Sequence, residues 1–119
     1  MNYDNNNIFA KIIRAEIPCN KIYEDDFVLS FYDINPQKKI HALVIPKGKY
    51  IDLDDFNTNA SNEEIIGLMK GITTVAKKLG ISSIDGQGYR ALANISDYGG
   101  QEVPHLHFHL FGGEKVGKM

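Results

Sequence analysis

The chain has 119 residues, of which 43% are hydrophobic and 24% are charged, and its formal net charge is −2. Length and composition fit one globular domain with a core of its own. The weak charge excludes a basic field for wrapping duplex nucleic acid, and the single cysteine, Cys19, excludes an internal disulfide. No apolar run reaches the ~20 residues that a membrane span needs. We therefore expect a cytoplasmic protein that binds neither nucleic acid nor membrane.

The start of the chain predicts a flexible segment followed by a short helix. Residues 1–7 are polar and rich in asparagine, so we predict that they fray and that residues 8–119 form the single domain. Apolar residues at helical spacing predict a helix over 8–15, and Pro18 prevents it from continuing much further.

The middle of the chain predicts a small antiparallel meander and then one long helix. Three runs of apolar residues bounded by turns predict strands over 21–24, 27–33 and 40–45. Ser61 with Glu64 three residues later is typical of a capping box, and an apolar stripe then continues to Leu79. Gly80 follows, at a position where a helix commonly ends.

The last third predicts two more strands, over 89–95 and 103–111, joined by a loop over 96–101. Strands therefore dominate, beside one long helix and one short helix. This pattern predicts an α+β domain in which helices pack on an antiparallel sheet of about five strands.

Three of the four histidines, His105, His107 and His109, stand at alternate positions of the last predicted strand. Because side chains alternate between the faces of a strand, the three imidazoles share one face. The opposite face carries apolar residues, namely Leu106, Phe108 and Leu110. Desolvated imidazoles need partners, so packing alone is a poor explanation and the pattern favours a functional role.

Two kinds of chemistry use such a set of histidines. Neutral imidazoles bind zinc, copper or iron, and a middle imidazole oriented by its neighbours can also act as a nucleophile. The glycine-containing turn over 97–101 directly before the histidines can direct backbone N–H groups toward an anion. The strand itself holds no carboxylate to complete a common metal triad. We predict phosphate chemistry without metal or cofactor, and keep a metal-dependent enzyme as the alternative.

The run His-x-His-x-His followed by two apolar residues resembles the signature of the histidine triad (HIT) superfamily. The similarity extends over further blocks at residues 8–18, 23–26, 33–37 and 41–47, at Asn94, and over residues 99–113. The Gly112-Gly113 pair after the triad resembles the ending found in the Hint branch, the histidine triad nucleotide-binding proteins. This resemblance implies a homodimer whose sheets join across the interface, and a purine nucleoside 5′-phosphoramidate hydrolase that releases AMP or GMP.

The resemblance also implies roles for individual residues. His107 matches the nucleophile that becomes nucleotidylated, and His109 matches the residue that contacts the phosphate. His105 and His41 match the histidines that complete the cluster, and Asp33 matches the residue that binds the ribose hydroxyls. The other matching positions line the base pocket or lie near the phosphate: Phe9, Ile12, Ile34, Asn94, Gly100, Gln101 and Glu102.

Physical chemistry adds two expectations about this site. One ring nitrogen of His107 should donate to a nearby backbone carbonyl, which leaves the other nitrogen free to attack. The backbone amides of Gly100 and Gln101 should stabilise charge that develops on the phosphoryl oxygens.

The chain departs from the family pattern at three positions. Asn7 and Ala10 stand where many relatives carry the cysteines of a structural zinc site, and Glu102 stands where relatives often carry a hydroxyl. The departure at Glu102 keeps a non-catalytic nucleotide-binding or sensor protein as an alternative function. Dinucleoside polyphosphate hydrolysis is a further alternative, which the Gly112-Gly113 pair disfavours.

Overall fold

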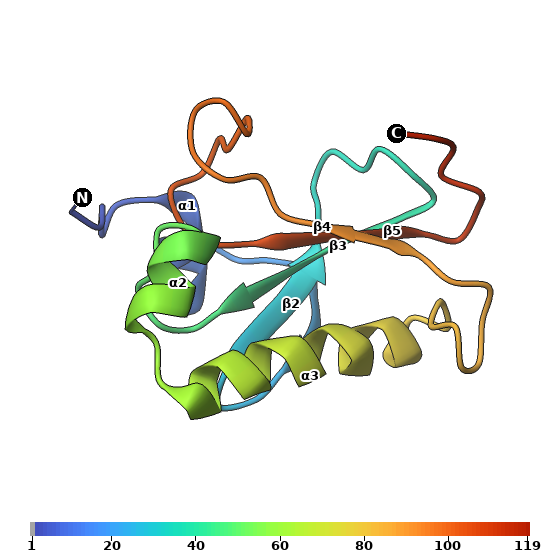
Figure 1. Ribbon diagram of the computed structural model, residues 1–119, viewed down its shortest axis with the longest axis horizontal. Helices are drawn as coiled ribbons and strands as arrows, with labels where there is room; N and C mark the ends of the chain where they lie inside the picture. Colours follow the sequence, from blue (N-terminus) through green and yellow to red (C-terminus); the bar gives the residue numbers. More distant parts are fainter. Residues whose placement is uncertain (1) are drawn as a thin grey trace.

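A computed structural model describes residues 2–119 as one antiparallel sheet with three helices (Figure 1). The elements in chain order are α1 (Ile8–Ile13), β1 (Lys21–Glu24), β2 (Val28–Tyr32), β3 (Ile40–Pro46), α2 (Leu53–Asn59), α3 (Asn62–Lys78), β4 (Arg90–Leu92) and β5 (Phe108–Gly112). The strand order is β1-β2-β3-β5-β4, and all neighbours pair antiparallel. The predicted α+β class with a five-stranded antiparallel sheet is confirmed.

The two faces of the sheet carry separate apolar clusters, because successive side chains of a strand point to opposite faces. The face that α3 covers, here called the α3 face, is built from Ile22, Val28, Ala42, Val44, Phe56, Leu68, Ile72, Val75, Leu106 and Leu110. The opposite face, here called the α1 face, is built from Phe9, Leu29, Phe31, Leu43 and Ile45. Figure 1 shows α3 running along one side of the sheet.

The long helix α3 begins and packs as its sequence requires. The Ser61 side chain accepts from the Glu64 backbone amide and the Glu64 side chain accepts from the Ser61 amide, which confirms the predicted capping box. Gly71 lies directly against β2, where an added Cβ would come within 3.0 Å of the Val28 side chain. The glycine therefore lets the helix approach the sheet closely, at some cost in helix propensity.

The C-terminal strands are shorter than predicted. β5 begins at Phe108 rather than at residue 103, and β4 covers only Arg90–Leu92 of the predicted 89–95. Pro104 has no N–H to give to a ladder. The Leu106 amide instead donates to the Tyr50 carbonyl, outside the sheet. Residues 103–107 therefore approach the sheet as an irregular segment.

Helix α2 was not predicted, because its seven residues are too few for a clear apolar stripe. Asp52 caps it by accepting from the Asp55 amide, and Phe56 anchors it in the α3 face. None of the helices described in residues 2–119 is long and apolar enough to cross a membrane.

The N-terminal segment makes specific contacts. Asn7 is buried and caps α1, with its side-chain oxygen accepting from the Ala10 amide at 2.9 Å. Tyr3 reaches the side chain of His105. The flexibility of residues 1–7 in solution stays a prediction, and Met1 lies outside the described residues.

Candidate active site

All four histidines gather on the α1 face of the sheet. His109 lies in β5, His41 lies in the neighbouring strand β3, and His105 and His107 lie in the irregular segment before β5. The ring centroids of His107 and His109 are 5.0 Å apart, and those of His41 and His109 are 5.2 Å apart. The predicted alternation is confirmed, because Leu106 and Leu110 pack into the α3 face.

Contacts around His107 leave one ring nitrogen free. Its Nδ1 lies 2.7 Å from the His105 carbonyl oxygen. A carbonyl can only accept, so Nδ1 carries the proton and Nε2 keeps its lone pair. Burial lowers the pKa of His107, so the ring is neutral at neutral pH. The expected donation to a backbone carbonyl is confirmed.

His105 is held at both ring nitrogens and is fully buried. Its Nε2 lies 2.8 Å from the Pro46 carbonyl oxygen, so Nε2 donates. Its Nδ1 lies 2.6 Å from the Tyr3 hydroxyl. Burial lowers the pKa of His105 to about 4, which keeps the ring neutral.

His41 and His109 form a directed hydrogen-bond chain. The Gln37 backbone amide donates to His41 Nδ1 at 3.2 Å, so the neutral His41 carries its proton on Nε2. That Nε2–H donates to His109 Nδ1 at 2.9 Å. Burial first, and then the neighbouring histidines, lower the pKa of His109 to about 4. The neutral His109 therefore carries its proton on Nε2, as a donor.

A carboxylate also reaches this cluster. Potential metal-ligating atoms of Asp33, His41 and His109 all lie within 4.8 Å of one another. The last strand itself holds no carboxylate, as noted from the sequence, but the fold brings Asp33 to the cluster from the turn after β2. A metal on His41 Nε2 would move the proton to Nδ1, against the donating Gln37 amide. A metal-ligating histidine normally donates through its second nitrogen, so the present bonding favours the hydrogen-bond chain.

The turn before the histidines does not present its amides as predicted. The Gly100 amide donates to the Asp97 carbonyl and the Gln101 amide donates to the Ser96 carbonyl, both at 3.0 Å. Gly99 is required for the turn, because a Cβ there would meet the Ile95 carbonyl oxygen at 2.3 Å. In this conformation both amides are engaged within the turn, so their role in binding an anion stays a prediction.

The Gln101 side chain fastens the same turn to the rest of the fold. Its Oε1 accepts from the Ser96 amide, and its Nε2 donates to the carbonyls of Ile51 and Val103. All three bonds are internal to the protein, so Gln101 shapes the approach to the histidines.

Two further predicted residues lie around this turn. Glu102 is exposed, and its negative charge acts with that of Asp33 against the burial that lowers the pKa of His107. Its carboxylate is therefore within electrostatic reach of the imidazole. Asn94 is half-buried in the segment after β4.

The residues predicted to line a base pocket have different surroundings. Phe9 is buried, and its ring packs edge-on against His107 at a centroid distance of 4.9 Å. Ile12 packs against the α1 face beside it. Ile34 is 87% exposed and is not part of that cluster. The structure thus brings Phe9, but not Ile34, against the histidines.

A large groove lies elsewhere on the molecule. It has a volume of about 1280 Å³ and is lined by residues 80–81, 86–90 and 113–118. It contains no histidine and no paired titratable groups that would indicate catalysis, so its size does not make it the reactive site.

Three partners of the histidines were missed in the sequence. Gln37 and Pro46 act through backbone atoms, which every residue type shares, so residue identity gave no signal. The turn at Pro36 did place Gln37 close to His41 in the chain. Tyr3 stands 102 positions before His105, and no spacing rule connects them.

Comparisons with known proteins agree with this geometry. A sequence model of the HIT domain matches residues 14–116. A HIT-like protein of Azospirillum brasilense is 50% identical over 98% of this chain and 93% of its own. The purine nucleoside phosphoramidase of Escherichia coli is 44% identical over 94% of this chain and 91% of its own. The solved structure of a HIT family hydrolase from Clostridium thermocellum is 37% identical and superposes with a TM-score of 0.86, covering 98% and 97% of the two chains.

Proposed function

Because the chain belongs to the HIT domain family, we propose that it is a hydrolase that cleaves purine nucleoside 5′-phosphoramidates at the α-phosphate. His107 Nε2 attacks phosphorus, and the bond from phosphorus to the leaving nitrogen breaks as that nitrogen takes up a proton from solvent. Water then cleaves the new bond from phosphorus to His107 and releases AMP or GMP. Splitting the displacement into two steps lowers the barrier of each.

The hydrogen-bond partners of the four imidazoles carry this proposal. His107 presents a lone pair at Nε2, and His109 beside it presents an N–H at Nε2. A lone pair next to a donor suits in-line attack on a phosphoryl group whose oxygens gain hydrogen bonding in the transition state. His41 fixes the proton on His109, and His105 supplies the carbonyl that fixes the proton on His107.

Substrate recognition is proposed from the family resemblance together with these positions. Asp33 accepts from the ribose hydroxyls, since its Oδ2 is engaged only at 3.5 Å with His41. Phe9, Ile12 and Ile34 contact the base. Asn94 and the turn at Gly100–Glu102 approach the phosphate. No cofactor or metal takes part, and the protein acts in the cytoplasm.

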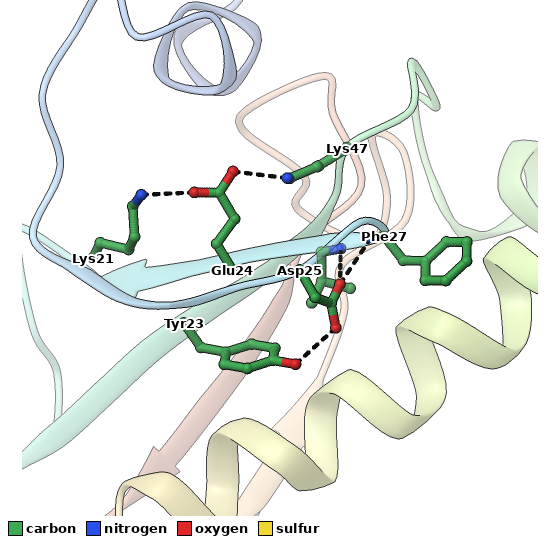
Figure 2. Close-up of polar contacts among 7 residues, drawn as sticks. Lys21, Tyr23, Glu24, Asp25, Phe27 and Lys47 are labelled. Atoms are coloured by element: carbon green, nitrogen blue, oxygen red, sulfur yellow. Dashed lines mark hydrogen bonds and ion pairs between the residues drawn. The ribbon is translucent and has the colours of Figure 1, made fainter.

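We further propose a homodimer that joins two sheets along β4. The two edge strands of the sheet are β1 and β4. Figure 2 shows Glu24 of β1 bridging Lys21 and Lys47, whose ammonium groups lower the pKa of Glu24 to about 2. Charged side chains on an edge strand discourage pairing with another chain, which leaves β4 as the edge for dimerisation. Light scattering of the purified protein, with Ala91→Pro in β4 as the disrupting variant, tests this assignment.

Hydrolysis is tested with adenosine 5′-monophosphoramidate in EDTA, by following AMP release. The parent should turn over, and His107→Ala should release no AMP while still binding AMP in a titration. Mass spectrometry of the quenched parent should show an added adenylyl group that the variant lacks. Binding of AMP without turnover by the parent would favour the sensor function. Activity that returns only on adding a divalent metal would favour the metal-dependent alternative.

A further inference from the structure

Tyr3 reaches the histidine cluster from outside the region that the HIT domain model matches. It precedes α1, whereas the match begins at residue 14. Its hydroxyl lies 2.6 Å from His105 Nδ1, and the two rings meet edge-on with centroids 5.7 Å apart. The contact therefore connects the N-terminal segment to the irregular segment before β5, at a fully buried imidazole.

The direction of this hydrogen bond follows from the other side of the ring. The Pro46 carbonyl takes the proton on His105 Nε2, so Nδ1 of the neutral ring has only a lone pair. The Tyr3 hydroxyl must therefore donate. Burial raises the pKa of Tyr3, which keeps the hydroxyl protonated at neutral pH.

A further link connects this ring to the nucleophile. The His105 backbone carbonyl accepts the His107 Nδ1 proton at 2.7 Å. The side chain and the carbonyl belong to one residue, so holding the ring at both nitrogens restricts the position of that carbonyl. Tyr3 provides one of those two restraints, and Pro46 provides the other.

We propose that Tyr3 is a positioning residue that, by donating to His105, orients His107 for attack. The inference rests on the proposed function and adds to it a residue that acts through another. Without the hydroxyl, a buried acceptor on His105 loses its partner, and the ring can rotate or change tautomer. The His105 carbonyl then holds the His107 proton less well, so the attacking lone pair is less well aimed.

Tyr3 is not the only residue that holds the N-terminal segment against the domain. Asn7 also anchors it, since its Nδ2 donates to the Asp4 carbonyl at 2.7 Å and its Oδ1 caps α1 through Ala10. The same side chain interacts with the Tyr3 hydroxyl, where it lowers the pKa of Tyr3 against the larger effect of burial. Loss of the Tyr3 hydroxyl should therefore leave the segment in place, and the positioning effect can be measured apart from folding.

The test compares Tyr3→Phe with Tyr23→Phe in the full chain. Both remove one tyrosine hydroxyl and its hydrogen bond, because Tyr23 donates to Asp25 at 2.9 Å, on the β1 side of the molecule (Figure 2). We expect kcat for adenosine 5′-monophosphoramidate to fall about fivefold in Tyr3→Phe, the loss of one hydrogen bond, with KM unchanged. We expect Tyr23→Phe to keep the parental kcat.

Long-range ¹H–¹⁵N spectra of the imidazoles supply a readout independent of activity. In the parent, His105 should show a protonated Nε2 and His107 a protonated Nδ1. In Tyr3→Phe the His105 signals should shift toward mixed tautomers, and in Tyr23→Phe they should not. Parental kcat and unchanged His105 signals in Tyr3→Phe would overturn the inference. If the parent lacks phosphoramidase activity, the proposed function fails, while the spectra still decide whether Tyr3 orders His105.

Asn7→Ala separates positioning from mere anchoring. This variant removes the α1 cap, loosens the same segment and takes one polar neighbour from the Tyr3 hydroxyl, but it keeps the hydroxyl that donates to His105. It should lower the urea midpoint more than Tyr3→Phe does, and lower kcat less. The opposite ranking, with kcat following stability in both variants, would show that Tyr3 acts only by holding the segment and would overturn the inference.

Discussion

The two faces of the sheet solve the problem of burial in different ways. The α3 face is filled by apolar side chains from the strands and α3, with interactions that have no required direction. The α1 face combines five buried apolar residues with four imidazoles, three of which are buried. Each imidazole is held by hydrogen bonds with a defined direction. The α1 face therefore depends on individual partners, whereas the α3 face depends on total apolar fit.

Replacing His109 should give the largest effect and separate the two faces most clearly. His109→Ala removes the donor beside the proposed nucleophile, His107, so we expect kcat to fall by about 10² to 10⁴. The unfolding free energy should fall by about 1 to 3 kcal/mol, because the buried His41 Nε2–H loses its acceptor. Steady-state kinetics and urea denaturation measure the two quantities. A variant that keeps parental kcat would remove His109 from the chemistry.

The next residue along β5 should behave in the opposite way. Leu110→Ala empties a fully buried position on the α3 face, and we expect it to lower the unfolding free energy by about 4 kcal/mol. At a temperature where it is still folded, kcat should remain within about twofold of the parent, because Leu110 faces away from the histidines. A loss of kcat as large as that of His109→Ala would mean that the faces are not independent.

Acid should destabilise the α1 face first. Burial lowers the pKa of all four histidines, to about 4 for His105 and His109. Below about pH 6.5 the unfolded chain binds protons that the folded chain excludes, so stability falls as pH falls from there toward 4. The shift at His105 alone corresponds to about 3 kcal/mol. Urea midpoints measured from pH 7.5 to 4.5 test this, and a flat profile between pH 7 and 5 would contradict it.

A smaller effect on the free energy of unfolding is expected at Ser30, whose hydroxyl is buried on the α3 face. Among the described residues, Ser30 has the buried side-chain oxygen that lacks a hydrogen-bond partner. Ser30→Ala should raise the unfolding free energy by about 1 kcal/mol, because it removes an uncompensated desolvation cost. Ser82→Ala is the matched control: Ser82 is also buried but donates to Asp85 at 2.5 Å, so its loss should destabilise. Equal changes in the two variants would contradict the comparison.

Features that depend on local pattern were predictable from the sequence. Alternation of apolar residues with histidines placed the three imidazoles on one face, and Ser61 with Glu64 marked the start of α3. The first helix was also expected, although it ends at Ile13 rather than at residue 15. Each of these follows from periods and caps that a few neighbouring residues define.

Features that depend on distant or backbone partners were not predictable. The donor and acceptor nitrogens of His41, His105 and His109 follow from Gln37, Pro46 and Tyr3. Gln37 is near His41 in the chain but acts through its backbone, and Pro46 and Tyr3 are distant from His105 in the sequence. The direction of the Gly100 and Gln101 amides depends on turn geometry that glycine permits but does not determine. The sequence did contain a signal for helix α2, since Asp52 is a favourable cap and acidic residues fill the first turn. The helix is too short, however, for an apolar period to be recognised.

The place of β5 in the strand order matters for synthesis of the chain on the ribosome. β5 is the last strand to be made, yet it lies between β3 and β4 and is the partner of both. A nascent chain that ends before residue 108 therefore has two unpaired strand borders and an open α3 face, features that promote association between chains. Because the same strand brings His109 and completes the sheet, a prematurely terminated product would lack both the complete histidine cluster and a closed fold. Degradation of such fragments, rather than residual activity, is the expected fate in the cell.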